Sequence, residues 1–354
     1  MSHKILVINT GGTSTKVGLF DSTVPIFVES IKHAEEELAR FSDINAQEAF
    51  REKVVLDFLA EKNIGINTLT AVAARGGLLR PMEGGTYLVN EKIINDLIEG
   101  KRGLHASHLS AQIGNAIAQK AGIACYIVDP ISVDEYEPIA RITGHKLFHR
   151  ESLTHALNMK AVAKRYAKEN HLDYNKIVLI TVHLGTGISL AIHKNGKMVD
   201  AINPKEEGTF SGDRSGGLPV LQVVRYVLDN QADFKTFSKK LFGNGGLNSY
   251  FGTKDFRKIT EMYRAGNQEV IDVVNAMAYQ VAKDVGALAT VNCGHIDVIL
   301  LTGGMAYEDY FTDLVKKRVQ FIAPVATYPG EDEMEALAEG ICRVLDNEEE
   351  AKIY

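Results

Sequence analysis

Two stretches, half the chain apart, share one pattern: an apolar strand, a turn rich in glycine and hydroxyl residues, and a second apolar strand. They are residues 4–20 and residues 177–193. Repetition of this unit predicts a duplicated fold with a cleft between its halves, where a ligand would contact both turns. The alternative is that any two β-hairpins look alike at this level of pattern. The length of 354 residues also favours two domains, because a single hydrophobic core rarely grows that large.

Short β-branched runs and helical stretches alternate along the chain, which indicates an α/β fold. The strand runs are 4–9, 16–20, 87–90, 125–129, 176–185, 189–203 and 297–304, and the helical stretches include 45–62, 107–121, 152–169, 219–229 and 267–288. Asn195 and Gly196 lie between two alternating runs and predict a tight hairpin, so the sheets are expected to be mixed. We place the two domains at residues 1–170 and 171–354.

Composition excludes several classes of protein. Apolar residues make up 45% of the chain and charged residues 24%, as in ordinary globular proteins, and the net charge of -6 argues against nucleic acid as a partner. No stretch approaches the roughly 18 apolar residues of a membrane span, and no secretory leader pattern is present. Cys125, Cys293 and Cys342 lie far apart in apolar contexts and are expected to be buried and reduced. A cytoplasmic location is expected.

The first glycine turn reads INTGGTSTK, from Ile8 to Lys16. Glycines allow close approach of the backbone to a ligand, hydroxyls donate hydrogen bonds, and the lysine adds a positive charge, which together suit a phosphate. The turn is not a Walker A loop, because it leads into a strand instead of a helix. A tight hairpin without a ligand is the alternative.

Further glycine-rich segments follow strands later in the chain. HLGTG at 183–187 adds a histidine that could donate to a phosphoryl oxygen, and LLTGG at 300–304 could admit a base or ribose against its backbone. The polar stretch 242–257 is either a loop near a ligand or a surface lid.

Several charged residues stand where a ligand could use them. Arg214 is flanked by glycines, and Arg75 lies in an apolar segment where a charge needs a partner; an ordinary buried ion pair is the alternative for both. Asp129 ends a strand, at the edge where ligand sites of α/β proteins collect. Segment 329–340 opens a helix with acidic residues, which the helix dipole alone would favour. The histidine pairs 105/108 and 149/155 suit core or anion contacts better than zinc.

The motifs INTGGTSTK, ARGG, VDP, FH, HLGTG, GDRSGG, LLTGG and a late acidic helix start occur in this order over nearly the whole chain. Together they resemble the acetate and butyrate kinase family, and VDPISVDEYEPIARITG and RSGGLP resemble its butyrate kinase branch. The resemblance implies a duplicated actin-like ATPase fold, with the acceptor on the N-terminal domain and the nucleotide on the C-terminal one. It also implies reversible transfer of a phosphoryl group from ATP to butyrate or a similar short-chain carboxylate, with Mg²⁺, by a homo-oligomer.

The same resemblance assigns roles to individual residues. Phosphate contacts are expected from Asn9, Gly11, Gly12, Thr13, Ser14, Lys16, Gly185, Thr186 and Gly187, and nucleotide contacts from Asp255, Arg257, Gly303, Gly304 and Met305. Asp129, Glu333 and Asn9 are expected near Mg²⁺, and Arg214, His149 and His183 near the transferred group. Gly12 stands where the family usually has serine, and Thr186 replaces an asparagine of acetate kinases. Arg75 does not match the family's second active-site arginine, whose place Val72 holds, but it could take over that role.

A carboxylate acceptor is already an anion at pH 7, so its phosphorylation needs no general base. Charge neutralisation and positioning are then the main catalytic tasks. A sugar kinase must deprotonate a hydroxyl and usually opens with an acidic turn, whereas this chain has Asn9 at that position. A sugar or other hydroxyl kinase, or a nucleotide-binding assembly protein without catalysis, are the alternative functions.

Overall fold

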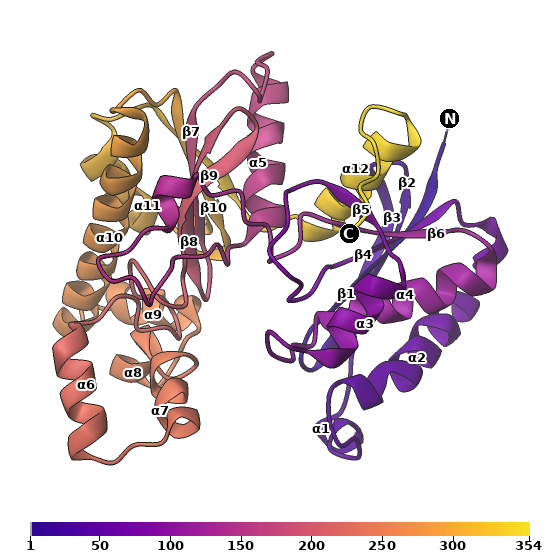
Figure 1. Ribbon diagram of the computed structural model, residues 1–354, viewed down its shortest axis with the longest axis horizontal. Coiled ribbons are helices and arrows are strands. Elements are labelled where there is room, and N and C mark those ends of the chain that lie inside the picture. Colours follow the sequence, from indigo (N-terminus) through magenta and orange to yellow (C-terminus); the bar gives the residue numbers. More distant parts are fainter. Residues whose placement is uncertain (1) are drawn as a thin grey trace. The chain divides into compact units, whose positions relative to one another are not determined.

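The computed structural model describes residues 2–354, which form two compact units (Figure 1). Unit 1 comprises residues 2–134 and 332–354, and unit 2 comprises Glu135–Glu331. Each unit is an α/β layer structure with one mixed sheet, as the alternation of strands and helices predicts.

Unit 1 contains a six-stranded sheet in the order β3-β2-β1-β4-β6-β5. Its strands are β1 (Lys4–Thr10), β2 (Ser14–Asp21), β3 (Val24–Lys32), β4 (Ala71–Ala74), β5 (Thr86–Leu88) and β6 (Ala124–Val128). Its helices are α1 (Glu35–Leu38), α2 (Glu48–Glu61), α3 (Glu91–Glu99), α4 (His108–Ala121) and α12 (Glu333–Leu345), with short 3₁₀ turns η1 (Asn45–Gln47) and η2 (Ile66–Thr68).

Unit 2 contains a five-stranded sheet in the order β11-β10-β7-β8-β9. Its strands are β7 (Leu179–Leu184), β8 (Ile188–Lys194), β9 (Lys197–Ile202), β10 (Val298–Gly303) and β11 (Val325–Pro329). Its helices are α5 (Ala156–Glu169), α6 (Val220–Asp229), α7 (Phe234–Leu241), α8 (Gly246–Phe251), α9 (Phe256–Arg264), α10 (Gln268–Ala289) and α11 (Asp309–Val319), with 3₁₀ turns η3 (Pro138–Arg141), η4 (Thr290–Asn292) and η5 (Gly304–Tyr307).

The two sheets repeat one topology. In unit 1 an antiparallel meander of β1, β2 and β3 continues on the other side of β1 into the parallel strands β4 and β6. In unit 2, β7, β8 and β9 form the same meander, and β10 and β11 follow as the parallel strands. The duplication is therefore real, and the two glycine turns occupy equivalent β1–β2 and β7–β8 positions. The predicted hairpin at Asn195 and Gly196 is also present, with both residues at positive φ.

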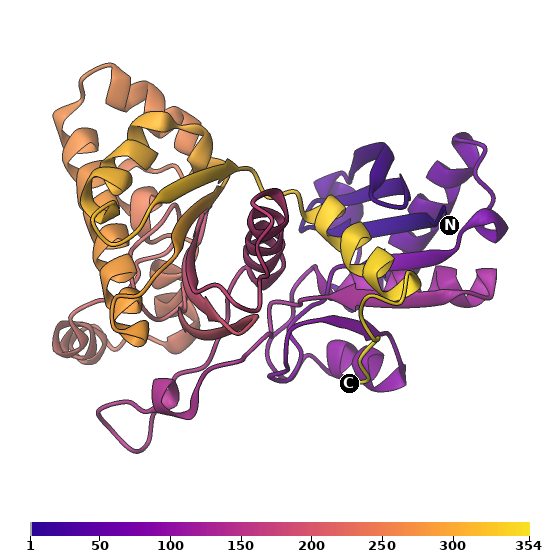
Figure 2. The same cartoon turned by 90° about the horizontal axis from the view of Figure 1, so that it is seen from above.

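The predicted boundary at residue 170 differs from the division of the structure, because α5 packs with the strands that follow it and α12 packs on the first sheet. Helix α5 packs on the sheet of unit 2, where Val162 and Ala163 join Leu179 and Leu300 in one apolar cluster. Helix α12, at the end of the chain, lies along the sheet of unit 1 in yellow (Figure 2). Its Gly340 has no side chain, which allows close contact with Val128.

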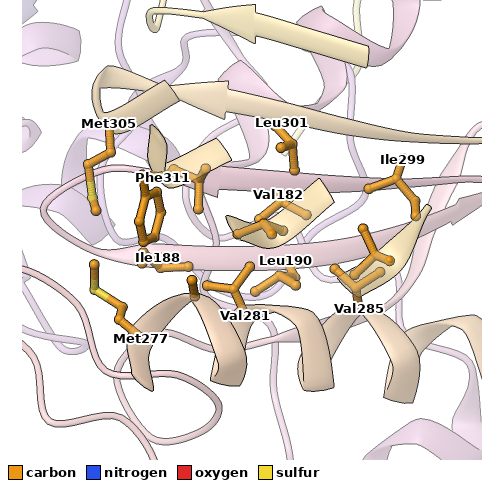
Figure 3. Packing of buried hydrophobic residues seen from close by; sticks show 14 of the residues in the cluster. Val182, Ile188, Leu190, Met277, Val281, Val285, Ile299, Leu301, Met305 and Phe311 are labelled. Atoms are coloured by element: carbon orange, nitrogen blue, oxygen red, sulfur yellow. The ribbon is translucent and has the colours of Figure 1, made fainter. Parts of the chain in front are cut away.

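The largest core lies between helix α10 and the sheet of unit 2. Met277, Val281 and Val285 of α10 face Val182 and Leu190 on the strands, and all five side chains are fully buried (Figure 3). Strands β7, β8 and β10 are buried along nearly their whole length, which explains their continuous apolar runs. This packing fixes the strand ends that carry the second and third glycine turns.

The sequence patterns did not predict strand β4, and they predicted the wrong burial for Cys293. Strand β4 consists of three alanines and a valine, so its sequence carries little β preference. Cys125 and Cys342 are buried as expected, but Cys293 is exposed at the end of η4, so its predicted burial is wrong. Within residues 2–354, no helix combines the length and the apolar character that crossing a membrane requires.

Candidate active site

The first glycine turn connects β1 to β2 in unit 1. The Gly11 amide donates to the Ser14 carbonyl at 2.8 Å and closes the turn, while Gly12 and Thr13 at its tip are exposed. Lys16 lies directly opposite Asn9 in the β1–β2 pairing, so both side chains emerge on the same face. The turn thus presents backbone amides, hydroxyls and one lysine at a strand end.

Asn9, Arg75 and Glu333 meet at the carboxyl edge of this sheet. Asn9 Nδ2 donates to Glu333 Oε2 at 2.7 Å, and Arg75 Nη1 donates to the same oxygen at 2.8 Å. Asn9 is 7% exposed, so its amide is held by the carboxylate and not by solvent. The ion pair that was the alternative for Arg75 exists, and it joins three predicted site residues.

Asp129 follows β6 at the same edge. Ile8 of β1 is level with Ala74 of β4, and Ala74 is level with Ile127 of β6, so Asp129 comes just beyond the level of Asn9 and Arg75. Its backbone has a φ of 37°, and its Oδ1 accepts a hydrogen bond from the Gly85 amide at 2.7 Å. The strained backbone and this bond fix the carboxylate at the strand end.

These residues have the donor chemistry that Mg²⁺ prefers. Asp129 commits Oδ1 and Glu333 commits Oε2 to hydrogen bonds within the described residues, which leaves one oxygen on each carboxylate for another partner. Mg²⁺ in phosphoryl-transfer sites is bound by one or two carboxylates, waters and phosphate oxygens. No cluster of three or more His, Cys, Asp or Glu side chains with metal-binding geometry occurs in residues 2–354. Two carboxylates, each with one uncommitted oxygen, are the ligand types that such sites use.

His183, on β7 of unit 2, is held in one tautomer. The side-chain amide of Asn158 donates to the Glu331 carbonyl at 2.8 Å, so its Oδ1 faces His183 Nδ1 at 2.8 Å and must accept the proton there. Nε2 consequently faces Glu331 Oε1 at 3.6 Å. The ring of His155 stacks on His183 with centroids 3.9 Å apart.

The turn after His183 has glycines where side chains would collide with site residues. A Cβ on Gly185 would lie 2.7 Å from His183 Nε2, and one on Gly187 would lie 2.2 Å from Arg214 Nη1. A Cβ on Gly303, whose φ is 91°, would lie 2.5 Å from the Leu184 carbonyl oxygen. The second and third glycine turns are therefore adjacent.

Arg214 is a partly buried cation whose Nε hydrogen-bonding capacity is unused. Its guanidinium lies 4.5 Å from the ring centre of Phe242 and 3.7 Å from Asp213 Oδ1, and its Nε is buried without a hydrogen-bond partner in the described residues. Burial lowers the pKa of Arg214, and the Asp213 carboxylate partly offsets this. An unsatisfied buried donor is costly, which is typical of a group that binds an anion.

A cavity of about 480 Å³ in unit 2 is lined by four of the five predicted nucleotide residues, and Gly303 is not among its lining. Its lining includes Gly185, Thr186, Gly212, Lys254, Asp255, Phe256, Arg257, Gly304, Met305 and Glu331. Arg257 is largely exposed and forms an ion pair with Asp255 at 2.8 Å. Of stretch 242–257, only residues 254–257 line this cavity.

The structure does not place His149 with the other site residues. His149 is exposed and pairs with Ile142 in a loop next to η3, which projects from unit 2 (Figure 2). None of the contacts described for His183 involves it; the stacked ring belongs to His155 instead. The spacing of His149 and His155 in the sequence did not indicate which of them lies beside His183. His155 reaches His183 because it directly precedes α5 in the fold. His108 is a core histidine, bonded to the Leu97 carbonyl and the Leu78 amide.

Sequence reasoning also missed Asn158, Lys254 and Glu331. Asn158 lies in the interior of a predicted helix without a charge or glycine to mark it, whereas Lys254 immediately precedes the predicted stretch from Asp255 to Arg257. Glu331 belongs to the acidic run at 331–333, where the late metal-linked glutamate was assigned to Glu333. The structure separates their contacts: Glu333 faces Asn9 and Arg75, and Glu331 faces His183.

A model described as the acetokinase family matches residues 138–321. The chain is 47% identical to butyrate kinase 2 of Clostridium acetobutylicum, with 100% of both chains covered. Acetate kinase of Porphyromonas gingivalis superposes with a TM-score of 0.76 at 19% identity, covering 96% of this chain and 99% of that one. A putative N-acetylmannosamine kinase of Listeria monocytogenes gives 0.50 at 14% identity, covering 97% and 99%. The structural likenesses confirm the actin-like ATPase fold, and the family match and the full-length identity show that the chain belongs to the acetokinase family.

Proposed function

We propose that this protein is a butyrate kinase, which transfers the γ-phosphoryl group of ATP to butyrate or a similar short-chain fatty acid and also runs in reverse. A carboxylate oxygen forms a bond to the γ-phosphorus, the bond from that phosphorus to the β–γ bridging oxygen breaks, and ADP leaves with the electron pair. No proton is transferred. The observation that carries this proposal is the 47% identity to a butyrate kinase over the whole chain.

The residues at the first strand end support a carboxylate acceptor. Asn9 carries no charge, and its amide hydrogen bonds to Glu333, so it cannot act as a base. Arg75 adds positive charge beside it. A hydroxyl acceptor would need a carboxylate base, whereas an anionic acceptor needs neutralisation of the repulsion between two anions. The sugar kinases share the fold, but the uncharged Asn9 at the end of β1 favours a carboxylate acceptor.

We assign the nucleotide to the cavity of unit 2. Gly304 and Met305 would lie against the adenosine, and Lys254 and Arg257 supply positive charge at the rim. Gly185 and Thr186 would contact phosphate oxygens through their backbone. The glycines keep this wall free of side chains, which allows a flat base and a ribose to approach closely.

We assign Mg²⁺ to Asp129 and Glu333, with Asn9 beside them, because two carboxylates at one sheet edge suit a cation that retains waters and phosphate oxygens. When bound, it would neutralise charge on the phosphate chain. Arg214 would stabilise charge on the transferred group, since its Nε is buried without a hydrogen-bond partner in the described residues. His183 would donate or accept at Nε2, a position that Asn158 fixes.

We further propose a homo-oligomer in the cytoplasm. The exposed apolar residues of α6, including Val220, Leu221 and Leu228 at 71%, 83% and 71% exposure, support an oligomeric contact. Light scattering during size-exclusion chromatography should give a molar mass at least twice that of the 38.8 kDa chain. A monomeric mass at micromolar concentration would contradict the proposed homo-oligomer.

Trapping of the product with hydroxylamine tests the function. Purified protein with ATP, Mg²⁺ and butyrate should accumulate butyryl hydroxamate, and omission of butyrate should abolish the signal. Acids of two to five carbons run in parallel would rank the acceptors. Absence of hydroxamate from every acid, with ATP consumed only when a sugar is present, would overturn the proposal in favour of a hydroxyl kinase.

A further inference from the structure

Arg51, on helix α2 of unit 1, lies beneath the first glycine turn. It is 1% exposed. Nη1 donates to the carbonyls of Gly11 and Ser14 at 2.8 and 3.0 Å, and Nη2 donates to the carbonyl of Gly12 at 2.8 Å. Gln47, one turn earlier on the chain, accepts from Nε and Nη2 and orients the guanidinium. One side chain thus holds three carbonyls of a turn that is 37 to 40 residues away in sequence.

Because the peptide bond is planar, the direction of each held carbonyl also fixes the direction of the amide that follows it. In a trans peptide the C=O and the following N–H point in opposite directions. No peptide in the described residues is cis. Because Arg51 holds the carbonyls of Gly11 and Gly12, the amides of Gly12 and Thr13 are directed away from it. Neither amide donates to a protein acceptor in residues 2–354. Two adjacent amides with this orientation form an anion-binding concavity.

The charge of Arg51 has no carboxylate partner in the part of the chain that the structure describes. Its contacts are three carbonyls, the Thr15 hydroxyl and the amide oxygen of Gln47, all of them neutral. By contrast, Arg150 in unit 2, also largely shielded from solvent, faces both Asp200 and Glu207. An isolated buried charge is costly. A phosphate at the exposed side of the turn would supply the opposite charge that the protein does not.

We propose that Arg51 is a positioning residue that directs the Gly12 and Thr13 amides toward a bound phosphate group and supplies a buried positive charge behind them. This inference rests on the phosphate contacts that the family resemblance implies for the turn. It explains how a turn with Gly12 in place of a serine binds phosphate: the backbone donors are held in place from below.

Three variants test the proposal: Arg51→Met, Arg51→Lys and Lys53→Met. Lys53 lies on the same helix with its side chain 74% exposed, so its loss controls for removal of one positive charge from α2. Calorimetry would give the dissociation constant of Mg·ADP, and hydrogen exchange would give the protection that ADP confers on residues 11–15. Arg51→Met should weaken ADP binding about tenfold or more and abolish this protection, on the scale of a lost charged hydrogen-bond donor. The KM for butyrate should change less than twofold, and Lys53→Met should match the wild type.

Arg51→Lys keeps the charge but cannot hold the carbonyls of Gly11 and Gly12 in one rigid fork. It should bind ADP with intermediate affinity, and it remains informative if Arg51→Met does not fold. Folded Arg51 variants that bind ADP within twofold of the wild type would overturn the inference, as would a wild type in which ADP does not protect residues 11–15. These measurements need no acceptor. A protein that shows the predicted ADP protection but no carboxylate turnover would therefore contradict the proposed function and leave the role of Arg51 standing.

Discussion

Arg75 and Glu333, 258 residues apart in sequence, form an ion pair of 2.8 Å at the carboxyl edge of the sheet of unit 1. The pair exists because α12, the last helix of the chain, packs on the first sheet and brings its acidic N-terminus to the end of β1. Asn9 donates to the same carboxylate oxygen, so the three side chains form one hydrogen-bonded group. This group links the glycine turn to the late acidic helix start, two motifs from opposite ends of the sequence.

Glu333→Gln tests this group. The substitution keeps the size of the side chain but removes the charge that Arg75 neutralises and that would hold Mg²⁺. We expect kcat to fall about 10²-fold or more and the Mg²⁺ concentration for half-maximal rate to rise, since a charged partner and a metal ligand are lost together. Glu335→Gln, two residues further along the same helix, is the matched control. Equal Mg²⁺ dependence in the wild type and Glu333→Gln would show that Glu333 has no part in cation binding.

Gly187→Ala should act through Arg214. The added Cβ would lie 2.2 Å from Arg214 Nη1, and because this atom ends a flexible side chain, the guanidinium should move while the fold survives. We expect Arg214→Ala to lower kcat about 10²-fold or more. Gly187→Ala should lower kcat by nearly as much as Arg214→Ala does, while its thermal unfolding midpoint stays near that of the wild type. The variant that carries both substitutions should have the same kcat as Arg214→Ala alone.

Gly12→Ala provides the contrast for Gly187→Ala, since no atom lies within 4 Å of a Cβ at position 12. Its activity should stay within a few-fold of the wild type. Independent, multiplicative losses in the Gly187→Ala and Arg214→Ala double variant would refute the steric link.

Substitution of His149 and substitution of His155 should have very different effects on kcat. His155 stacks on His183 and bonds through Nδ1 to Ser189 Oγ at 2.9 Å, whereas His149 is exposed. Steady-state rates should show a loss of kcat for His155→Ala and near wild-type turnover for His149→Ala. The opposite ranking would restore the assignment of His149 that the family resemblance implies.

Asp284 should make stability depend on pH. Burial raises its pKa to about 6 from 3.8, with a smaller contribution from Glu207, while the Thr209 amide and Lys283 oppose the shift. Between these two values the folded chain binds a proton that the unfolded chain has lost, so stability should decrease as pH rises from about 4 to about 6. Asp284→Asn should flatten this slope in urea unfolding at pH 4.5 and 6.5. Asp313→Asn, at an exposed position, should retain it.

Much of the fold could be predicted from the sequence, because the features that define it are local. The two glycine turns, the Asn195–Gly196 hairpin and the long buried strands each carry their own pattern, and together they predicted the duplicated mixed sheets. The domain limits could not be predicted. They depend on which sheet each of α5 and α12 packs against, and an amphipathic helix does not identify its partner.

The residues of the candidate site also divide into those that the sequence marks and those that it does not. Asn9, Asp129 and His183 stand at strand ends, where ligand sites form, so the sequence marks them as candidates. Arg51 and His155 carry no such mark, since their contacts are made by tertiary packing. Arg51 in particular lies in a helix whose sequence shows only an ordinary charged residue.

Phosphorus NMR of a single reaction tests the central claim most directly. With ATP, Mg²⁺ and butyrate, resonances of butyryl phosphate and ADP should grow in equal amounts, and addition of ADP to purified butyryl phosphate should regenerate ATP. Formation of ADP with inorganic phosphate alone, or of a sugar phosphate when sugars are supplied while butyrate stays unchanged, would contradict the account.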